Sequence, residues 1–250
     1  MKTFVYLYFL ISCSCYYDNY ISPSVQIIEG TLPILITIPH DGNKILNYVP
    51  IRKDTLLNFN IKNDLHTKSI GLDIANELYS LTGKSPTIII NNIHRKFVDL
   101  NRDSKSAYSS TRTKIIYNNY HKFIHKEIKN KLIKNESVLL LDLHGFSCDT
   151  IDVSLSTRNH KTLYNKNEFD LIFKSNSGIY KSLLNNNFIT KINNPFYGGF
   201  TIKNISTKFN KNLSAIQIEL GNKIRFNNNE RERFVKLISK SLKYYIETKE

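Results

Sequence analysis

The chain has 250 residues, the size of one α/β domain with a substantial core. Its 35 basic and 21 acidic residues give a net charge of +14, but no recognisable nucleic-acid-binding motif accompanies that charge, so we expect no specific nucleic-acid partner. Three cysteines without a CxxC pattern argue against a disulfide framework and against a cysteine-based zinc knuckle.

The first 20 residues have features of an export segment. Lys2 precedes a short apolar run that ends in small residues, as in a signal peptide. Leu10-Ile11-Ser12-Cys13 also matches a bacterial lipoprotein cleavage box, so a membrane partner is expected only through a lipid anchor at Cys13. The alternative is an ordinary first strand, and the chain is accordingly expected either in the cell envelope or in the cytoplasm. Residues 21–250 are expected to form a single domain.

Apolar patterning from residue 25 onward predicts strands that alternate with helices. Strands are expected at 25–29, 34–38, 86–90, 137–145, 151–155 and 214–220, and helices at 66–81, 114–133, 168–185 and 230–248. The first two strands are expected to pair with each other, and residues 43–63 and 185–211 are expected to be mainly loop. This alternation indicates a layered α/β fold.

Two of the predicted strands each lead to a histidine and then a glycine. The strand at 34–38 is followed by His40 and Gly42, and the strand at 137–145 ends with His144 and Gly145. Both strands are apolar almost throughout, which is typical of strands buried on both faces. In open α/β sheets, ligands bind at the carboxyl ends of the strands. His40 and His144 are therefore candidate zinc ligands, and the alternative for each is a hydrogen-bonded core histidine.

A second histidine pair competes with the first. His121 and His125 are four residues apart on the helix predicted at 114–133, so they can share a face. The glutamate that follows the first histidine in His-Glu-x-x-His metalloproteases is missing here. A solvated or helix-capping role is favoured for this pair.

Several charged residues are candidates for the chemistry itself. Glu219 lies late in an apolar strand, directly before Leu220 and a glycine, and a buried carboxylate can act as a general base. Its alternative role is an ion pair with Lys223 or Arg225. Asp142 lies two residues before His144 on the same strand face, so it can support that ligand, with a plain salt bridge as the alternative.

A basic segment adds a candidate binding group. Arg102, next to Asn101, can form a fork that binds a carboxylate. The alternative is a surface salt bridge with Asp99 or Asp103.

Seven short stretches occur in an informative order along the chain. They are Ile38-Pro39-His40-Asp41-Gly42, Asn63-Asp64-Leu65-His66-Thr67, His94-Arg95-Lys96-Phe97-Val98-Asp99-Leu100-Asn101-Arg102, Tyr120-His121, Asp142-Leu143-His144-Gly145, Asn194-Pro195-Phe196-Tyr197-Gly198-Gly199-Phe200 and Ala215-Ile216-Gln217-Ile218-Glu219-Leu220. Taken together, they resemble the N-formylglutamate amidohydrolase family. The resemblance covers about residues 25–245, and the stretches at 98–102 and 217–220 are its strongest evidence.

The resemblance implies a three-layer α/β/α sandwich with a mixed, largely parallel central sheet, similar to zinc carboxypeptidases and aspartoacylases. It also implies a zinc-dependent hydrolase of a C–N amide bond. The expected substrate is an N-acyl amino acid like N-formylglutamate, or a small peptide, with a carboxylate. One Zn²⁺ ion would be held by His40 and His144, and Glu219 would act as general base and acid.

The same resemblance assigns the substrate-binding residues. Arg102, helped by Asn101, would hold the substrate carboxylate or polarise the scissile carbonyl. Gly198 and Gly199 would line the pocket.

One position departs from the carboxypeptidase-like pattern. Those sites usually have a glutamate three residues after the first histidine, where this chain has Asn43. Asp64 is the candidate third metal ligand, with Asp41, Asn43 itself or water as alternatives. Asn43 also motivates a second function hypothesis, a catalytically inactive binding protein on the same scaffold. An exported chain would instead suit a peptide or peptidoglycan amidase.

Overall fold

A central sheet organises the computed structural model, which describes residues 24–53, 59–209 and 211–249. In this part of the chain seven strands follow the order β1-β3-β2-β4-β7-β5-β6. Neighbouring strands are parallel except at β1/β3 and β5/β7. The strands are β1 (Val25–Ile28), β2 (Ile34–Ile38), β3 (Thr87–Asn91), β4 (Val138–Gly145), β5 (Val153–Ser156), β6 (Thr190–Ile192) and β7 (Leu213–Leu220). The predicted mixed, largely parallel sheet is confirmed.

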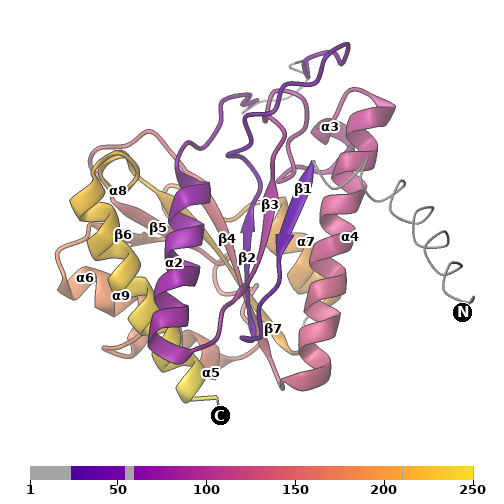
Figure 1. The fold of residues 1–250 in the computed structure, drawn as a ribbon. Coiled ribbons are helices and arrows are strands. Elements are labelled where there is room, and N and C mark those ends of the chain that lie inside the picture. Colours follow the sequence, from indigo (N-terminus) through magenta and orange to yellow (C-terminus); the bar gives the residue numbers. More distant parts are fainter. Residues whose placement is uncertain (1–23, 54–58, 210, 250) are drawn as a thin grey trace, which may run out of the picture.

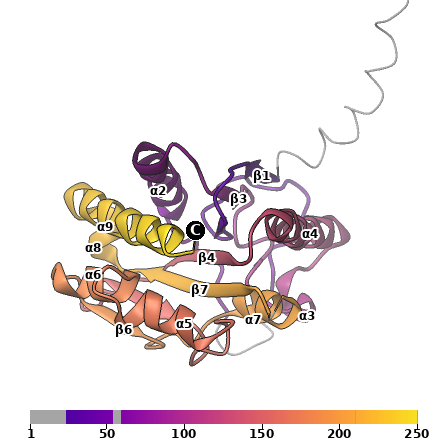
Figure 2. The same cartoon turned by 90° about the horizontal axis from the view of Figure 1, so that it is seen from below.

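Helices cover both faces of this sheet (Figure 1, Figure 2). They are α2 (Thr67–Thr82), α3 (Ser104–Ala107), α4 (Thr111–Lys134), α5 (Lys166–Phe169), α6 (Ile179–Asn185), α7 (Phe200–Lys208), α8 (Asn222–Phe226) and α9 (Asn228–Glu247), with a π-helical turn at Asp170–Lys174. α2 and α9 lie on one face, and α4 and α7 lie on the other. The three-layer α/β/α sandwich is therefore confirmed.

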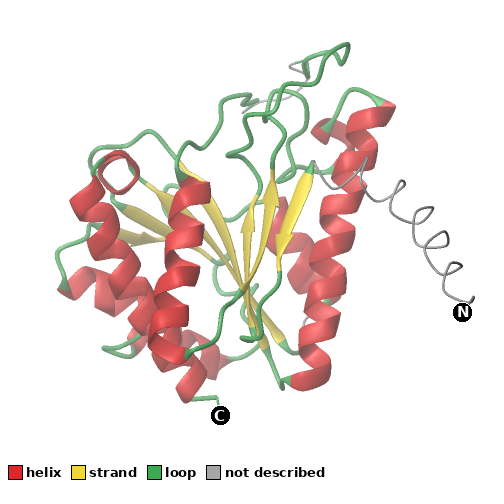
Figure 3. Ribbon diagram, viewed as in Figure 1, coloured by secondary structure: helices red, strands yellow, loops and turns green. Residues whose placement is uncertain are grey.

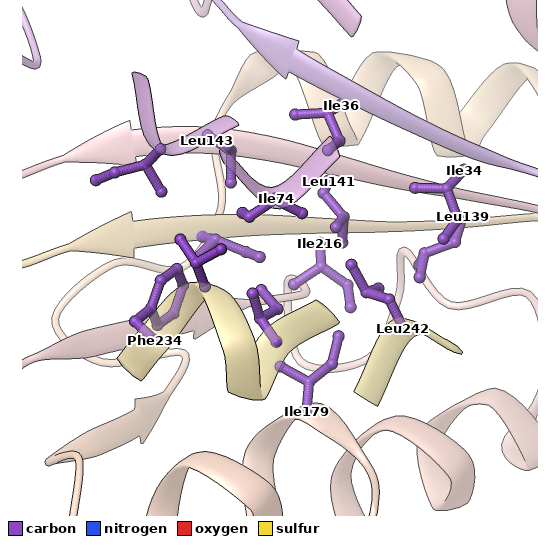
Figure 4. Close-up of a cluster of buried hydrophobic side chains, with 14 of the residues drawn as sticks. Ile34, Ile36, Ile74, Leu139, Leu141, Leu143, Ile179, Ile216, Phe234 and Leu242 are labelled. Carbon is purple, nitrogen blue, oxygen red and sulfur yellow. The ribbon is translucent and has the colours of Figure 1, made fainter. Parts of the chain in front are cut away.

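Alternate residues of the central strands feed two hydrophobic cores. Ile36 and Leu141 pack with Ile74 of α2 on one face (Figure 4). Leu35, one residue from Ile36, joins the core that contains Ile124 of α4 on the other face. Successive side chains of a strand point to opposite faces, so a strand covered on both faces has to be apolar throughout. This explains why the apolar runs predicted these strands well.

The predicted pairing of the first two strands is wrong. β3 lies between β1 and β2, antiparallel to β1 and parallel to β2. The segment that joins β1 to β2 crosses the start of β3, where Leu32 N donates to Ser85 O at 3.0 Å. Gly30 approaches the backbone of Ser85 and Pro86 so closely that a Cβ there would lie 2.2 Å from Ser85 O. Residues 30–33 therefore carry the chain across the start of β3 and do not form a hairpin turn.

Two helix and loop predictions also need correction. The region 185–211, predicted as loop, contains β6 and α7, and α7 is held by the buried residues Ile202 and Ile205. The helix predicted over 168–185 is broken before Gly178, which is the N-cap of α6 and lies against the carbonyl of Leu171. The predicted helix at 114–133 is confirmed but begins earlier, because Ser110 caps it.

The loops that follow the parallel strands gather at one edge of the sheet, drawn uppermost in Figure 3. This edge carries the candidate site. The predicted signal or lipoprotein segment, residues 1–20 with Cys13, lies outside the described residues. Within the described part of the chain, none of the helices combines the length and the apolar character that a bilayer crossing requires.

Candidate metal centre and active site

The sheet brings the two strand-end histidines together. β2 and β4 are parallel neighbours, with Thr37 paired to Asp142, so His40 and His144 emerge at the same edge. Their rings lie 4.9 Å apart between centroids, and both are buried.

Asp64 completes a three-residue cluster. Its Oδ2 lies 3.2 Å from Nδ1 of His40 and 3.2 Å from Nδ1 of His144. The backbone N–H of Asp64 donates to His40 O at 3.0 Å, which folds the loop before α2 over the end of β2. One ligand atom from each of the three residues lies within 4.8 Å of the others, and no other such group of metal-binding side chains occurs among the described residues.

The alternatives for the third ligand lie elsewhere. Asp41 turns away to accept a hydrogen bond from Lys68 N at 2.7 Å, in the first turn of α2. Asn43 is exposed on the loop after β2. Of the candidate carboxylates, Asp64, in the chain before α2, is the one that contacts both histidines.

The competing histidine pair does not join this cluster. His121 is buried, with its ring 4.5 Å from that of Tyr117 and 5.6 Å from that of Phe200. The pKa of His121 is lowered to about 4, mainly because the ring is buried and secondly because His125 lies nearby. The solvated or capping role predicted for His121 is wrong, because the ring belongs to an aromatic layer under α4.

Each of the two candidate histidine ligands also contacts a second carboxylate through its Nε2. His40 Nε2 lies 2.7 Å from Asp99 Oδ1, and His144 Nε2 lies 2.9 Å from Asp142 Oδ2. Thr37 Oγ1 in turn donates to Asp142 Oδ1 at 2.6 Å. Metal-binding histidines characteristically donate their other ring N–H to such a carboxylate, and the tautomer with hydrogen on Nε2 leaves Nδ1 of each ring as the nitrogen that can bind an ion.

The support predicted from Asp142 is thus present, whereas Asp99 was considered only as a salt-bridge partner of Arg102. A signal for Asp99 exists in the sequence. It lies between Val98 and Leu100, and a carboxylate between two buried apolar residues needs a buried partner.

Arg95, which sequence reasoning passed over, ties these carboxylates together. Its Nη1 lies 3.1 Å from Asp64 Oδ1, and its Nε donates to Asp99 Oδ2 at 3.2 Å. Burial alone would raise the pKa of Asp99, but His40 and Arg95 hold it well below its usual range. Burial would also raise the pKa of Asp64, but His40, His144 and Arg95 lower it below its usual range. Both carboxylates are therefore ionised.

Glu219 faces the cluster from the next strand. β7 is parallel to β4, with Glu219 paired directly to His144. Gln217 Nε2 donates to Glu219 Oε1 at 2.7 Å. Burial raises the pKa of Glu219, against the opposing effect of His144, so this carboxyl retains a proton more readily than an ordinary glutamate. Lys223, considered as its ion-pair partner, pairs with Asp152 at 3.4 Å instead.

Two predicted substrate-binding residues, Asn101 and Gly199, form one hydrogen-bonded wall with Gln217. Asn101 Nδ2 donates to Gln217 Oε1 at 3.3 Å, and Gly199 N donates to the same oxygen at 2.6 Å. A Cβ on Gly199 would lie 2.3 Å from the Asn101 amide, so only glycine allows this approach. Gly198, at φ 111°, is in a backbone region that favours glycine. Arg102 lies beside this wall, with its Nε 3.6 Å from Asp99 and its side chain 33% exposed.

One cleft of about 1240 Å³ opens beside the cluster, and the fully buried His40 does not line it. Asp64, His144 and Glu219 line it, together with the predicted binding residues Asn101, Arg102, Gly198 and Gly199. Carboxylates and imidazoles that cluster beside a cleft, together with a buried glutamate, can bind a divalent ion and transfer protons.

Two solved structures share this fold. An N-formylglutamate amidohydrolase from Ralstonia eutropha aligns with a TM-score of 0.69 and 14% identity, over 90% of this chain and 99% of that chain. A gene product from Agrobacterium tumefaciens aligns with a TM-score of 0.67 and 14% identity, over 93% and 98% of the two chains. No protein-family model and no curated protein matches the sequence. The fold implied by the sequence resemblance is thereby confirmed.

Proposed function

We propose that this chain is a metal-dependent amidohydrolase that cleaves the C–N amide bond of an N-acyl amino acid or short acyl-peptide with a carboxylate. The observation that carries the proposal is the cluster of His40, Asp64 and His144 beside a cleft that Asp64, His144 and Glu219 line. The fold shared with an N-formylglutamate amidohydrolase supports the same reaction class.

The three candidate ligands fit a zinc ion. Two imidazole nitrogens and one carboxylate oxygen are a ligand set found in catalytic zinc sites, where a fourth position stays open. The carboxylates behind His40 and His144 orient both rings for this purpose. When bound, the ion would lower the pKa of a water molecule and polarise the substrate carbonyl.

The residues of the chain supply the proton transfers and the binding. Glu219 accepts a proton from the attacking water and delivers it to the amide nitrogen as the C–N bond breaks. Arg102, partly exposed in the cleft, binds the carboxylate of the substrate. The hydrogen-bonded wall of Asn101, Gln217 and Gly199 lies beside Arg102 and keeps that part of the cleft rigid.

The test measures metal content and turnover of N-formylglutamate, N-acetylglutamate and short N-acyl peptides by the purified protein. We expect about one zinc per chain. Glu219→Gln should lower kcat by about 100- to 10,000-fold while zinc content stays the same. Glu230→Gln is the matched control, since Glu230 lies in α9 and pairs with Arg233. A protein that binds zinc and turns over none of the panel would favour the inactive binding protein instead.

A further inference from the structure

The cleft has two chemically different walls, and the difference indicates the substrate. We propose that the acyl group of the substrate is large and apolar, and that it binds against Leu65, Phe146 and Phe226, which we call the apolar wall. The proposal rests on the proposed amide hydrolysis and adds the acyl specificity of that same site.

The apolar wall is built from three separate parts of the chain. Leu65 precedes α2, Phe146 follows β4, and Phe226 ends α8, and all three line the cleft. Leu65 is 50% exposed and Phe226 is 54% exposed. The Phe146 ring meets that of Phe196 edge to face, with centroids 5.2 Å apart, which extends the wall. When large apolar side chains line one cleft, binding of an apolar group there is favourable because it removes their surface from water.

Arg225 holds this wall in place. Its Nη1 donates to Leu65 O at 3.1 Å, and its Nη2 donates to Phe146 O at 3.0 Å. The guanidinium carbon lies 4.9 Å from the centre of the Phe226 ring. Arg225 is itself buried, so one side chain fixes all three members of the wall. A wall that is already ordered costs little entropy when a ligand binds.

The other wall of the cleft is cationic. Lys62, Lys96 and Arg102 line it, and Arg95 joins the two segments that carry them. Arg95 Nη1 donates to Lys62 O at 3.4 Å, and Arg95 N donates to Asn63 Oδ1 at 3.1 Å. These three cations thus lie on the segments that Arg95 joins. Arg225 also lines the cleft, but it is buried and its guanidinium donates to the backbone carbonyls of Leu65, Phe146 and Leu220.

This arrangement orients the substrate. The carboxylate belongs to the amino-acid part, which Arg102 binds, and the scissile carbonyl has to lie near His144 and Glu219. The acyl group then extends away from the cations, toward the apolar wall. A volume of about 1240 Å³ leaves ample room for it, because sites for small molecules span roughly 300–1,000 Å³.

The test compares N-phenylacetylglutamate with N-acetylglutamate, which differ by one phenyl ring next to carbonyls of similar reactivity. For the zinc-loaded protein we expect kcat/KM to be higher for the phenylacetyl substrate by about tenfold or more. Phe226→Ala should reduce that ratio about tenfold, and Leu65→Ala should reduce it in the same direction. Tyr79→Ala is the control, since Tyr79 is 60% exposed on α2 and does not line the cleft.

Binding to the zinc-loaded Glu219→Gln variant, measured by calorimetry, separates this proposal from the proposed function. If neither substrate is hydrolysed, the amidohydrolase proposal fails, and tighter binding of the phenylacetyl compound that Phe226→Ala abolishes still supports the apolar wall. If kcat/KM for N-acetylglutamate equals that for N-phenylacetylglutamate, the proposed acyl specificity is overturned, while the amidohydrolase proposal stands. A ratio that Phe226→Ala and Leu65→Ala both leave unchanged overturns it too.

Discussion

Replacing Arg95 with methionine removes the guanidinium but keeps a long, adaptable side chain in its place. Arg95 is buried and lies 3.1 Å from Asp64 Oδ1 and 3.2 Å from Asp99 Oδ2. Removing one partner of a buried ion pair costs about 3–5 kcal/mol, because the remaining charge is left buried. Here two carboxylates lose a partner, but His40 still contacts both. We therefore expect the free energy of unfolding to fall by about 3 kcal/mol.

The assay is urea unfolding of the metal-free protein at pH 7, followed by circular dichroism. With a slope of about 2–3 kcal/mol per molar urea, the midpoint should fall by about 1 M. Arg233→Met is the matched control, because Arg233 is 48% exposed and pairs with Glu230 at 2.7 Å. Exposed pairs contribute less than about 1 kcal/mol. A midpoint shift for Arg95→Met no larger than for Arg233→Met would refute this reasoning.

Further predictions concern the carboxylates of the site. Asp142→Asn should weaken zinc binding by about 10- to 100-fold in a chelator competition, and unchanged affinity would count against its support of His144. Asp64→Ala should abolish zinc binding, whereas Asp41→Ala should leave zinc binding intact. Asp41→Ala should lower the free energy of unfolding by about 1 kcal/mol, because Asp41 accepts a hydrogen bond from Lys68 N in the first turn of α2. The reverse pattern of zinc binding would make Asp41 the ligand. The folded-state pKa of Glu219 is raised, so its ionisation above the unfolded pKa of about 4.3 destabilises the fold. Glu219→Gln should therefore stabilise the metal-free protein at pH 7 in urea unfolding, an advantage that disappears below about pH 4; equal stability at pH 7 would contradict it.

Local sequence patterns were sufficient to predict the elements that carry the site. β2, β4 and β7 were predicted because strands buried on both faces are apolar at every position. Parallel strands present their carboxyl ends at one edge, so the candidates His40, His144 and Glu219 had to meet there once those strands became neighbours. Asp142 could be predicted too, since residues two apart on a strand share a face.

What only the folded chain decided was the choice of partners. Local signals did not show that β3 separates β1 from β2 or that Arg95 joins Asp64 to Asp99. They favoured Asp64 as the partner of the histidines but left Asp41 open as an alternative. These contacts join residues far apart in the chain: His40 meets a carboxylate 24 residues away and another 59 residues away, and His144 meets one 80 residues away. Periodicity reports only which face of an element is buried. Which distant side chain neutralises a buried charge depends on how the elements pack.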